Sequence, residues 1–255
     1  MENKTTPLVS VIMPAYNAAP FIEEAIGSVL AQTVSDLELI VIDDCSTDDT
    51  RDKIARMAEQ DGRIRFLENE ENMGVARTRN RGLGLCRGEY VALLDSDDYW
   101  KPGMLEKMIR RARETGADII YCSYELVDEL GKKLCNDFIV PPATTFRESI
   151  IRSVITCSSA LVTARLAKEN RFPTNMYHED IALWFQLLRD GTQARGVPEV
   201  LAAYRQRANS RAGNKLTSAC RRWVIYRKHL KMNVVQSVSL MIRYAYYGIL
   251  KFKRI

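Results

Sequence analysis

Two clusters of carboxylates are the residues of this sequence best suited to chemistry. Asp43 and Asp44 follow the apolar run LELIVI, and Asp95, Asp97 and Asp98 follow the apolar run YVALL. Carboxylates this close repel one another, and one of them would normally be forced to take a proton. A divalent cation removes that repulsion, because hard cations take oxygen ligands and Mg²⁺ typically binds one or two carboxylates together with substrate phosphates. We therefore expect these acids to surround a metal and a phosphorylated substrate.

Helix capping is the competing explanation for the same acids. Asp97 or Asp98 could cap a helix entered through Pro102, and residues 46–48 could cap a helix that continues to residue 60. Capping accounts well for residues 48–49. Two acid clusters that each close an apolar run favour a functional site for the others.

An arginine-rich segment, NMGVARTRNRG at residues 72–82, lies between the two clusters. Arg77, Arg79 and Arg81 cannot share one face of a helix, so one or two of them could face a crevice and bind a phosphate, while the rest are solvated. The start of that helix, at residues 74–76, also favours an anion. Because the sequence has neither a P-loop nor a G-x-G-x-x-G after the first apolar run, a nucleotide would be held by acids, a metal and side chains.

A further acidic pair, Glu179 and Asp180, precedes an aromatic helical pattern. One interpretation is a helix start with acids at its positive end, and the other is a general base that faces the crevice. The neighbouring His178 is interpreted as structural. Arg205 has two open interpretations as well, a cation near the phosphates or a solvated surface side chain.

The elements that must position these residues alternate at βαβ spacing in the first half of the chain. Nearly all-apolar strands are expected at residues 8–13, 37–42, 64–67 and 90–94, and helices at 21–32, 48–60 and 75–85. This alternation predicts an α/β fold with a mostly parallel, Rossmann-like sheet covered by helices on both faces. Ligands bind beyond the carboxyl ends of such strands, so both acid clusters and residues 14–17 should meet at one crevice.

The second half has a less regular pattern. We expect a strand at 118–124, a hairpin at 125–137 with its turn at 129–132, and helices at 104–114, 147–154, 164–170 and 179–190.

The charge of the chain is divided unevenly. The 255 residues carry a formal net charge of +5, yet no Asp or Glu follows Glu199, and residues 200–255 contain 13 Lys or Arg. An acidic body with a basic tail indicates an anionic partner for the tail. The six cysteines form no C-x-x-C pair and the N-terminus has no signal-peptide pattern, which favours a cytoplasmic protein with reduced thiols.

The basic tail also contains an apolar stretch at residues 232–250, which Arg243 interrupts. The uncharged part is shorter than the about 20 apolar residues that span a bilayer. Flanking lysines predict an interfacial amphipathic helix on an anionic membrane surface. The alternative is a helix packed on the domain or in a dimer, and no nucleic-acid recognition motif is present.

Five motifs in fixed order give the chain a family resemblance: VSVIMPAYN, ELIVIDDCSTD, NMGVARTRNRG, GEYVALLDSDD and the Glu-Asp pair before the aromatic helix. Together they resemble family two glycosyltransferases with the type-A fold, over residues 8–210. The chain is most similar to short bacterial enzymes of capsule, exopolysaccharide, teichuronic acid and lipopolysaccharide assembly. The Q-x-x-R-W motif of processive members is absent, which predicts one sugar transferred per encounter.

The resemblance implies roles for individual residues. Asp180 would be the general base, with Glu179 as its catalytic neighbour. Asp97, with Asp95, would bind Mn²⁺ or Mg²⁺ on the diphosphate, and Asp44 would bind the base of the nucleotide. The expected nucleotide-sugar site comprises Pro14, Ala15, Tyr16, Asn17, Asp43, Asp44, Asn72, Gly74, Arg77, Arg79, Asp95, Ser96 and Arg205.

The expected activity is the inverting, metal-dependent transfer of one sugar from a nucleoside-diphosphate sugar, with UDP favoured, to a hydroxyl of a lipid-linked glycan in surface polysaccharide synthesis. Residues 1–100 would form the nucleotide-sugar half, 101–210 the acceptor half, and 211–255 a membrane-associating tail at the inner face of the plasma membrane. A dimer is compatible with the sequence. The rival functions are a sugar-nucleotide nucleotidyltransferase, for which a Gly- and Arg/Lys-rich loop after the first strand is missing, and a non-catalytic sugar-nucleotide-binding protein.

Overall fold

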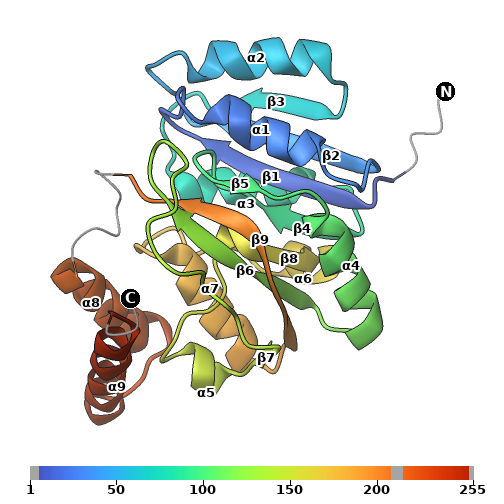
Figure 1. Ribbon diagram of the computed structural model, residues 1–255. Coiled ribbons are helices and arrows are strands. Elements are labelled where there is room, and N and C mark those ends of the chain that lie inside the picture. The colour runs from blue at the N-terminus through green and yellow to red at the C-terminus, as the bar shows by residue number, and fades with distance from the viewer. Residues whose placement is uncertain (1–5, 208–214, 253–255) are drawn as a thin grey trace.

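A large twisted sheet forms the centre of the protein in the computed structural model, which describes residues 6–207 and 215–252 (Figure 1). Within these residues the strand order is β3-β2-β1-β4-β8-β6-β9-β5, and β7 pairs with β9. The strands are β1 (Val9–Ala15), β2 (Leu37–Asp43), β3 (Ile64–Glu68), β4 (Tyr90–Leu93), β5 (Tyr99–Trp100), β6 (Ile119–Val127), β7 (Ala143–Thr144), β8 (Ala160–Thr163) and β9 (Ala194–Arg205).

The first four long strands are parallel, as the alternating sequence pattern predicted. β1 pairs with β2 and β4, and β2 pairs with β3, all in parallel. Every residue of β1, β2 and β4 is buried, which explains why these segments are almost entirely apolar. The register places Ala15 opposite Asp43, so the first acid cluster and the end of β1 lie side by side.

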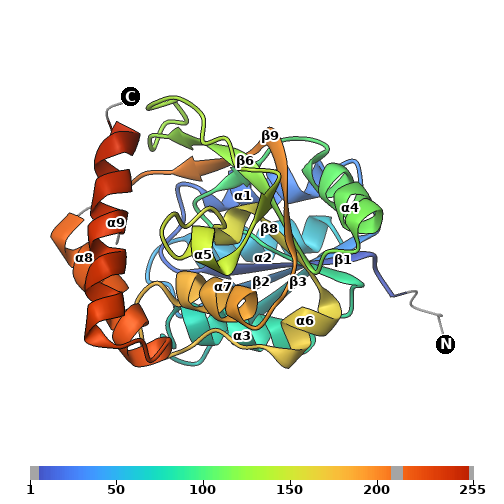
Figure 2. The ribbon, with the colours of Figure 1, turned by 90° about the horizontal axis from the view of Figure 1, so that it is seen from below.

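Helices cover both faces of the sheet (Figures 1 and 2). One core contains side chains of α1 (Ile22–Leu30), α2 (Thr50–Gln60) and α4 (Met104–Thr115), and a second contains side chains of α3 (Val75–Leu85), α6 (Ala164–Glu169) and α7 (Glu179–Arg189). In the second half β8 runs antiparallel to both of its neighbours, β4 and β6, whereas β9 is parallel to β6. The sheet is therefore mostly parallel and covered on both faces, as predicted.

Two predicted elements of the second half differ from the structure. The helix expected at 147–154 is only the short α5 (Phe146–Ser149), which begins with a capping box between Thr145 and Glu148. Ile150 and Ile155 are buried, so the chain leaves the helix to pack both side chains into the core. The hairpin at 125–137 has its turn where expected, but β6 pairs with the returning chain only through isolated bridges at Phe138 and Lys133.

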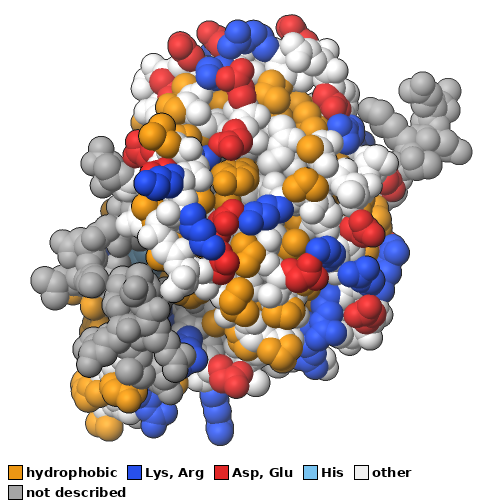
Figure 3. All heavy atoms as spheres, viewed as in Figure 1, with side chains coloured by type: hydrophobic (Ala, Val, Ile, Leu, Met, Phe, Trp, Pro, Cys, Tyr) orange, Lys and Arg blue, Asp and Glu red, His pale blue; other side chains and the backbone are white. Residues whose placement is uncertain are grey.

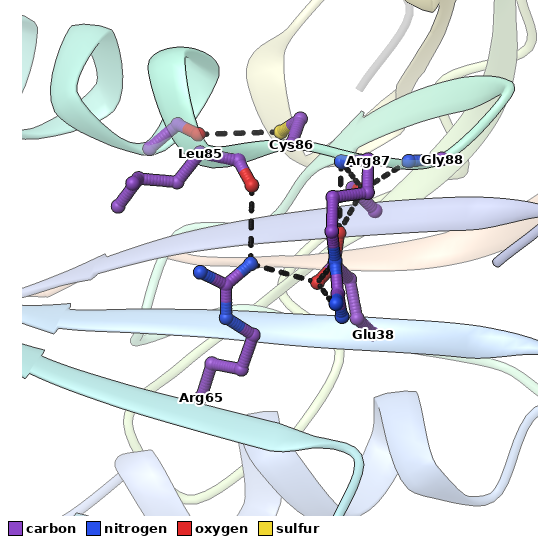
Figure 4. Close-up of polar contacts among 8 residues, drawn as sticks. Glu38, Arg65, Leu85, Cys86, Arg87 and Gly88 are labelled. Carbon is purple, nitrogen blue, oxygen red and sulfur yellow. Dashed lines mark hydrogen bonds and ion pairs between the residues drawn. The ribbon is translucent and has the colours of Figure 1, made fainter. Parts of the chain in front are cut away.

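A charge network around the buried Glu38 ties the amino-terminal ends of the parallel strands together (Figure 4). The Glu38 carboxylate on β2 accepts hydrogen bonds from Ser10 of β1, from Arg65 of β3 and from Arg87. Arg65 also donates to the Leu85 carbonyl, which fixes the end of α3. Glu38 is only 3% exposed, and these donors lower the pKa of its carboxyl against the opposing effect of burial.

The basic tail folds into α8 (Lys215–Val224), a π-helical turn η2 (Ile225–His229) and α9 (Val234–Phe252). Tyr226 of η2 is fully buried and donates to the Ile150 carbonyl, and Leu240 and Met241 of α9 pack against the same cluster. The alternative interpretation, a tail helix packed on the domain, thus holds for one face of α9, and the predicted membrane contact stays a prediction. Within the described part of the chain, no helix has both the length and the apolar character required to cross a bilayer.

Candidate active site

The loops after β1 and β2 hold each other at the carboxyl ends of these strands. Asp43 accepts hydrogen bonds from the backbone N–H and the hydroxyl of Ser46, at 3.0 and 2.5 Å. Asn17 has a positive φ of 47°, donates its N–H to Ser46 and accepts from the Thr47 N–H. The role of Asp43 and Asn17 in holding a nucleotide stays a prediction, and their observed contacts hold the loops after β1 and β2 together.

The remaining predicted contacts on β1 differ in exposure. Pro14 and Ala15 are buried within the strand, whereas Tyr16 is 46% exposed just beyond it. Tyr16 thus presents an aromatic ring at the position where the base of a nucleotide was expected.

Asp44 organises the start of α3. Its carboxylate accepts hydrogen bonds from the Asn69 side chain at 2.6 Å, from the Met73 N–H at 2.9 Å and from the Gly74 N–H at 2.8 Å. Gly74 has a φ of 81°, a conformation that favours glycine, and it directly precedes the helix. Asp44 is 3% exposed, so a further bond to a nucleotide base remains a prediction for a carboxylate that already has three protein donors.

Arg79 joins the two acidic regions that the sequence separates by about a third of the chain. One terminal nitrogen donates to Glu179 at 2.7 Å, and the other donates to Asp95 at 2.5 Å. The Arg79 side chain is 5% exposed, and its guanidinium lies 5.4 Å from the centre of the Phe172 ring. The end of β4 and the start of α7 therefore meet through one buried cation, whose terminal nitrogens both bind carboxylates, and the predicted phosphate contact of Arg79 stays a prediction.

Asp180 is the acid of the second pair that remains available. Glu179 is 8% exposed and bound to Arg79, whereas Asp180 is partly exposed. Burial raises the pKa of Asp180 from its ordinary value of 3.8 to about 6, and the charge of Glu179 adds to this rise while Arg79 opposes it. A carboxylate with a pKa near the operating pH is suited to accept a proton in catalysis.

The three acids after β4 have different environments. Asp98 is 2% exposed and accepts from the Ser158 hydroxyl at 2.5 Å and from the Arg205 N–H at 2.8 Å, so it is a structural residue. Asp95 and Asp97 keep 31% and 28% of their side-chain surface. Burial and the charge of Asp95 raise the pKa of Asp97. Ser96 is buried between them.

Asp95 and Asp97 fit a divalent cation that shares its ligands with a substrate. They are oxygen donors that repel each other, and a bound cation would remove this repulsion. Among the described residues, no group of three or more His, Cys, Asp or Glu is arranged to hold a metal. A metal here would take its other ligands from phosphate oxygens and water, which is the usual arrangement for Mg²⁺.

Arg205 is buried, so the interpretation as a solvated side chain is wrong, and its contact with a phosphate stays a prediction. Its side chain is 2% exposed and donates to the backbone carbonyls of Asp97 and Glu129 at 2.8 and 2.9 Å and to Glu24 at 2.5 Å. Arg205 therefore anchors the loop at residues 95–98, which we call the acid loop. Arg207, which the sequence analysis did not single out, lies 3.7 Å from Asp97. The R-x-R spacing of Arg205 and Arg207 at the end of β9 was the signal in the sequence that could have identified Arg207 as a second arginine near the acids.

A cavity of about 280 Å³ opens beside the Glu179-Asp180 pair. Its lining consists of the start of α3, including Gly74 and the exposed Arg77, and of the loop before α7, including Tyr177. Asn72 is exposed just before this lining. The cavity is lined by a helix start, by an arginine and by Glu179, the neighbour of the candidate base, and an acceptor or a phosphate could be held there.

The chain is similar to known proteins over almost its whole length. A family model described as "Glycosyl transferase family 2" matches residues 10–133. The putative teichuronic acid biosynthesis glycosyltransferase TuaG of Bacillus subtilis is 36% identical over 94% of this chain and 95% of its own length. The UDP-Glc:alpha-D-GlcNAc-diphosphoundecaprenol beta-1,3-glucosyltransferase WfgD of Escherichia coli is 32% identical over 96% of this chain and 94% of its own.

Solved structures share the fold at lower identity. The crystal structure of S. aureus TarS 1-349 in complex with UDP-GlcNAc has a TM-score of 0.72 at 20% identity, covering 93% of this chain and 71% of that one. The mannosyltransferase PcManGT from Pyrobaculum calidifontis, in complex with GDP-Man and Mn²⁺, has a TM-score of 0.69 at 20% identity, covering 95% and 70%.

Proposed function

We propose that this chain, which belongs to glycosyl transferase family 2 and is a glycosyltransferase with the type-A fold, transfers one sugar with inversion. Asp180 is the general base in this proposal. The observation that carries the proposal is the double ion pair of Arg79. It holds the start of α7 against the end of β4, and so brings the candidate base to the candidate metal acids.

The proposed reaction is a single displacement at the anomeric carbon. The acceptor hydroxyl attacks while Asp180 takes its proton, and the bond to the diphosphate breaks. A protein nucleophile is not required, because one base and one leaving group suffice for inversion. The transition state resembles the oxocarbenium ion of glycoside hydrolysis.

Arg79 has two tasks in this proposal. It neutralises Glu179, which leaves Asp180 as the base, and it limits the rise in the pKa of Asp180 so that the carboxylate is ionised near neutral pH. Asp95 and Asp97 would hold Mn²⁺ or Mg²⁺, and the ion would supply positive charge for the departing diphosphate. Arg207, beside Asp97, adds a second cation on the same side.

The names of the relatives support a substrate class. WfgD is named for transfer from UDP-Glc to a GlcNAc-diphosphoundecaprenol, and TuaG for teichuronic acid biosynthesis. We propose a UDP-sugar donor and a lipid-linked acceptor in bacterial surface polysaccharide synthesis, at the inner face of the plasma membrane. Residues 1–100 would bind the donor and residues 101–210 the acceptor, whereas the observed Arg79 contacts link these two halves.

A donor panel tests the proposed function. The full chain is incubated with Mn²⁺ and UDP-, GDP- and dTDP-sugars, and the released nucleotide is identified. Release of free UDP in the presence of acceptor, which Asp180→Asn lowers by a factor of about 10²–10⁴ while donor binding persists, is the expected result. Pyrophosphate as product would indicate a nucleotidyltransferase, and binding without any turnover of every donor would indicate a non-catalytic binding protein.

A further inference from the structure

Helix α9 is fixed to the body of the protein along one side. Ser237 is fully buried, and Leu240 and Met241 pack on a core that includes Phe185 of α7. The Arg222 guanidinium lies 4.7 Å from the centre of the Tyr244 ring. These contacts set the rotation of the helix about its axis and therefore determine which side faces outward.

The outward side of α9 is apolar. Val234, Val235, Val238 and Ile242 are 53%, 78%, 44% and 65% exposed, and we call these four residues the α9 face. At 3.6 residues per turn they lie within about 100° of the helix circumference, so they form one continuous stripe. The spherical atoms in Figure 3 show hydrophobic side chains beside Lys and Arg at the lower left, over α9.

Charge decides what can cover this stripe. The exposed cations Lys228, Lys231 and Arg243 lie before it or on its border, and residues 200–255 contain 13 Lys or Arg and no acid. A second copy of the chain would bring two such tails together, and their like charges would repel. An anionic lipid surface instead offers apolar contact for the valines and isoleucine and negative headgroups for the cations.

The position of the tail connects this surface to the active site. Figures 1 and 2 place α8 and α9 on the side of the molecule opposite the N-terminus, and β1 runs toward that side. Arg221 of α8 lies 4.4 Å from the centre of the Tyr177 ring, and Tyr177 lines the cavity beside Glu179. A bilayer at the α9 face would therefore meet the protein on the side of the site where an acceptor is expected.

We propose that the α9 face docks on the surface of an anionic lipid bilayer, with the cations of the tail on the headgroups. The link to a lipid-linked acceptor rests on the proposed function, whereas the docking itself rests on the exposed stripe and its charge. The helix lies in the interface and does not cross the bilayer.

Vesicle flotation of the full chain tests the docking. The vesicles contain phosphatidylcholine alone or phosphatidylcholine mixed with phosphatidylglycerol. The wild type should float with the mixed vesicles, less so at high salt, and the variant V238Q/I242Q should show about a tenfold lower bound fraction. Both side chains are exposed, so the variant should keep its thermal unfolding temperature.

The matched control is L134Q/I139Q, which changes two apolar side chains that are 48% and 60% exposed on another surface. It should float like the wild type. Equal flotation of V238Q/I242Q and wild type, or no flotation of the wild type, would overturn the docking. A wild-type dimer in sedimentation equilibrium that becomes a monomer in V238Q/I242Q would also overturn the docking and assign the α9 face to contact with a second copy. Release of UDP measured without vesicles tests the proposed chemistry separately, because the α9 face lies outside the candidate active site.

Discussion

Replacing Asp180 by asparagine should stabilise the protein while it removes transfer. Burial raises the pKa of Asp180 from 3.8 to about 6, so the folded state binds the proton more tightly than the unfolded chain does. Stability is then lost as the pH rises from 3.8 through 6, because above this range the folded state must hold a charged carboxylate where the neutral form is preferred.

The size of the effect follows from the same two values. A tenfold change in proton affinity corresponds to about 1.4 kcal/mol, so the raised pKa of Asp180 lowers the free energy of unfolding by about 3 kcal/mol at neutral pH. Asparagine is neutral at every pH and escapes this loss. The variant should therefore be more stable than the wild type by about 2–3 kcal/mol at pH 7.5, and by much less at pH 4.5.

Urea unfolding at the two pH values, with a chelator and without nucleotide, measures this difference. Asp36→Asn is the matched control, because Asp36 is exposed and the same substitution there should change stability by less than about 0.5 kcal/mol. A less stable Asp180→Asn protein at pH 7.5, or an equal gain at both pH values, would refute the reasoning. Transfer by the variant should fall by a factor of about 10²–10⁴, the contribution typical of a general base.

The remaining predictions concern the residues around this base and the opposite edge of the sheet. Asp97→Ala should abolish Mn²⁺-dependent binding of UDP in titration calorimetry, and an unchanged titration would contradict the metal assignment. Arg79→Met leaves Asp95 and Glu179 without their cation, so it should destabilise the protein by about 3–5 kcal/mol in urea unfolding. Because Arg79 lowers the pKa of Asp180, the acid limb of the pH profile of kcat/KM should move to higher pH in this variant, and Arg79→Lys should partly restore both properties. Glu38→Gln should cost about 2–3 kcal/mol at pH 7 and progressively less as the wild-type carboxyl takes its proton below pH 4.5, while UDP release by the folded protein stays the same.

The first half of the fold was predictable because its signals are local. Buried parallel strands require apolar runs, and turns at the sheet ends require polar residues, so strand and helix positions are evident in the sequence itself. The helix expected at 75–85 coincides with α3 (Val75–Leu85). The short antiparallel strands β5 and β7 carry too few residues to give a pattern, and their pairing depends on β9, which is distant in the chain.

The site was predictable in its residue types and less so in their roles. Three acids in DSDD look alike in the sequence, and only the positions of Ser158 and Arg205 show that Asp98 is structural. Arg79 was interpreted as one of the arginines that could face a crevice, and Arg205 either as a cation near the phosphates or as a solvated side chain, since an arginine gives no sign of burial in the sequence. Their partners are a glutamate 100 residues later and backbone carbonyls of two loops, which only the tertiary structure brings together.

The anchoring of the acid loop by Arg205 sets an order for biosynthesis. Asp98 and Glu24 bind a residue that leaves the ribosome 107 and 181 positions after them. Domains generally fold as units, so the loop at residues 95–98 gains its contacts with Arg205 only once β9 has been made. A nascent chain that ends before β9 would therefore hold Asp95 through Arg79, while Asp98 and Glu24 would still lack the contacts that Arg205 supplies.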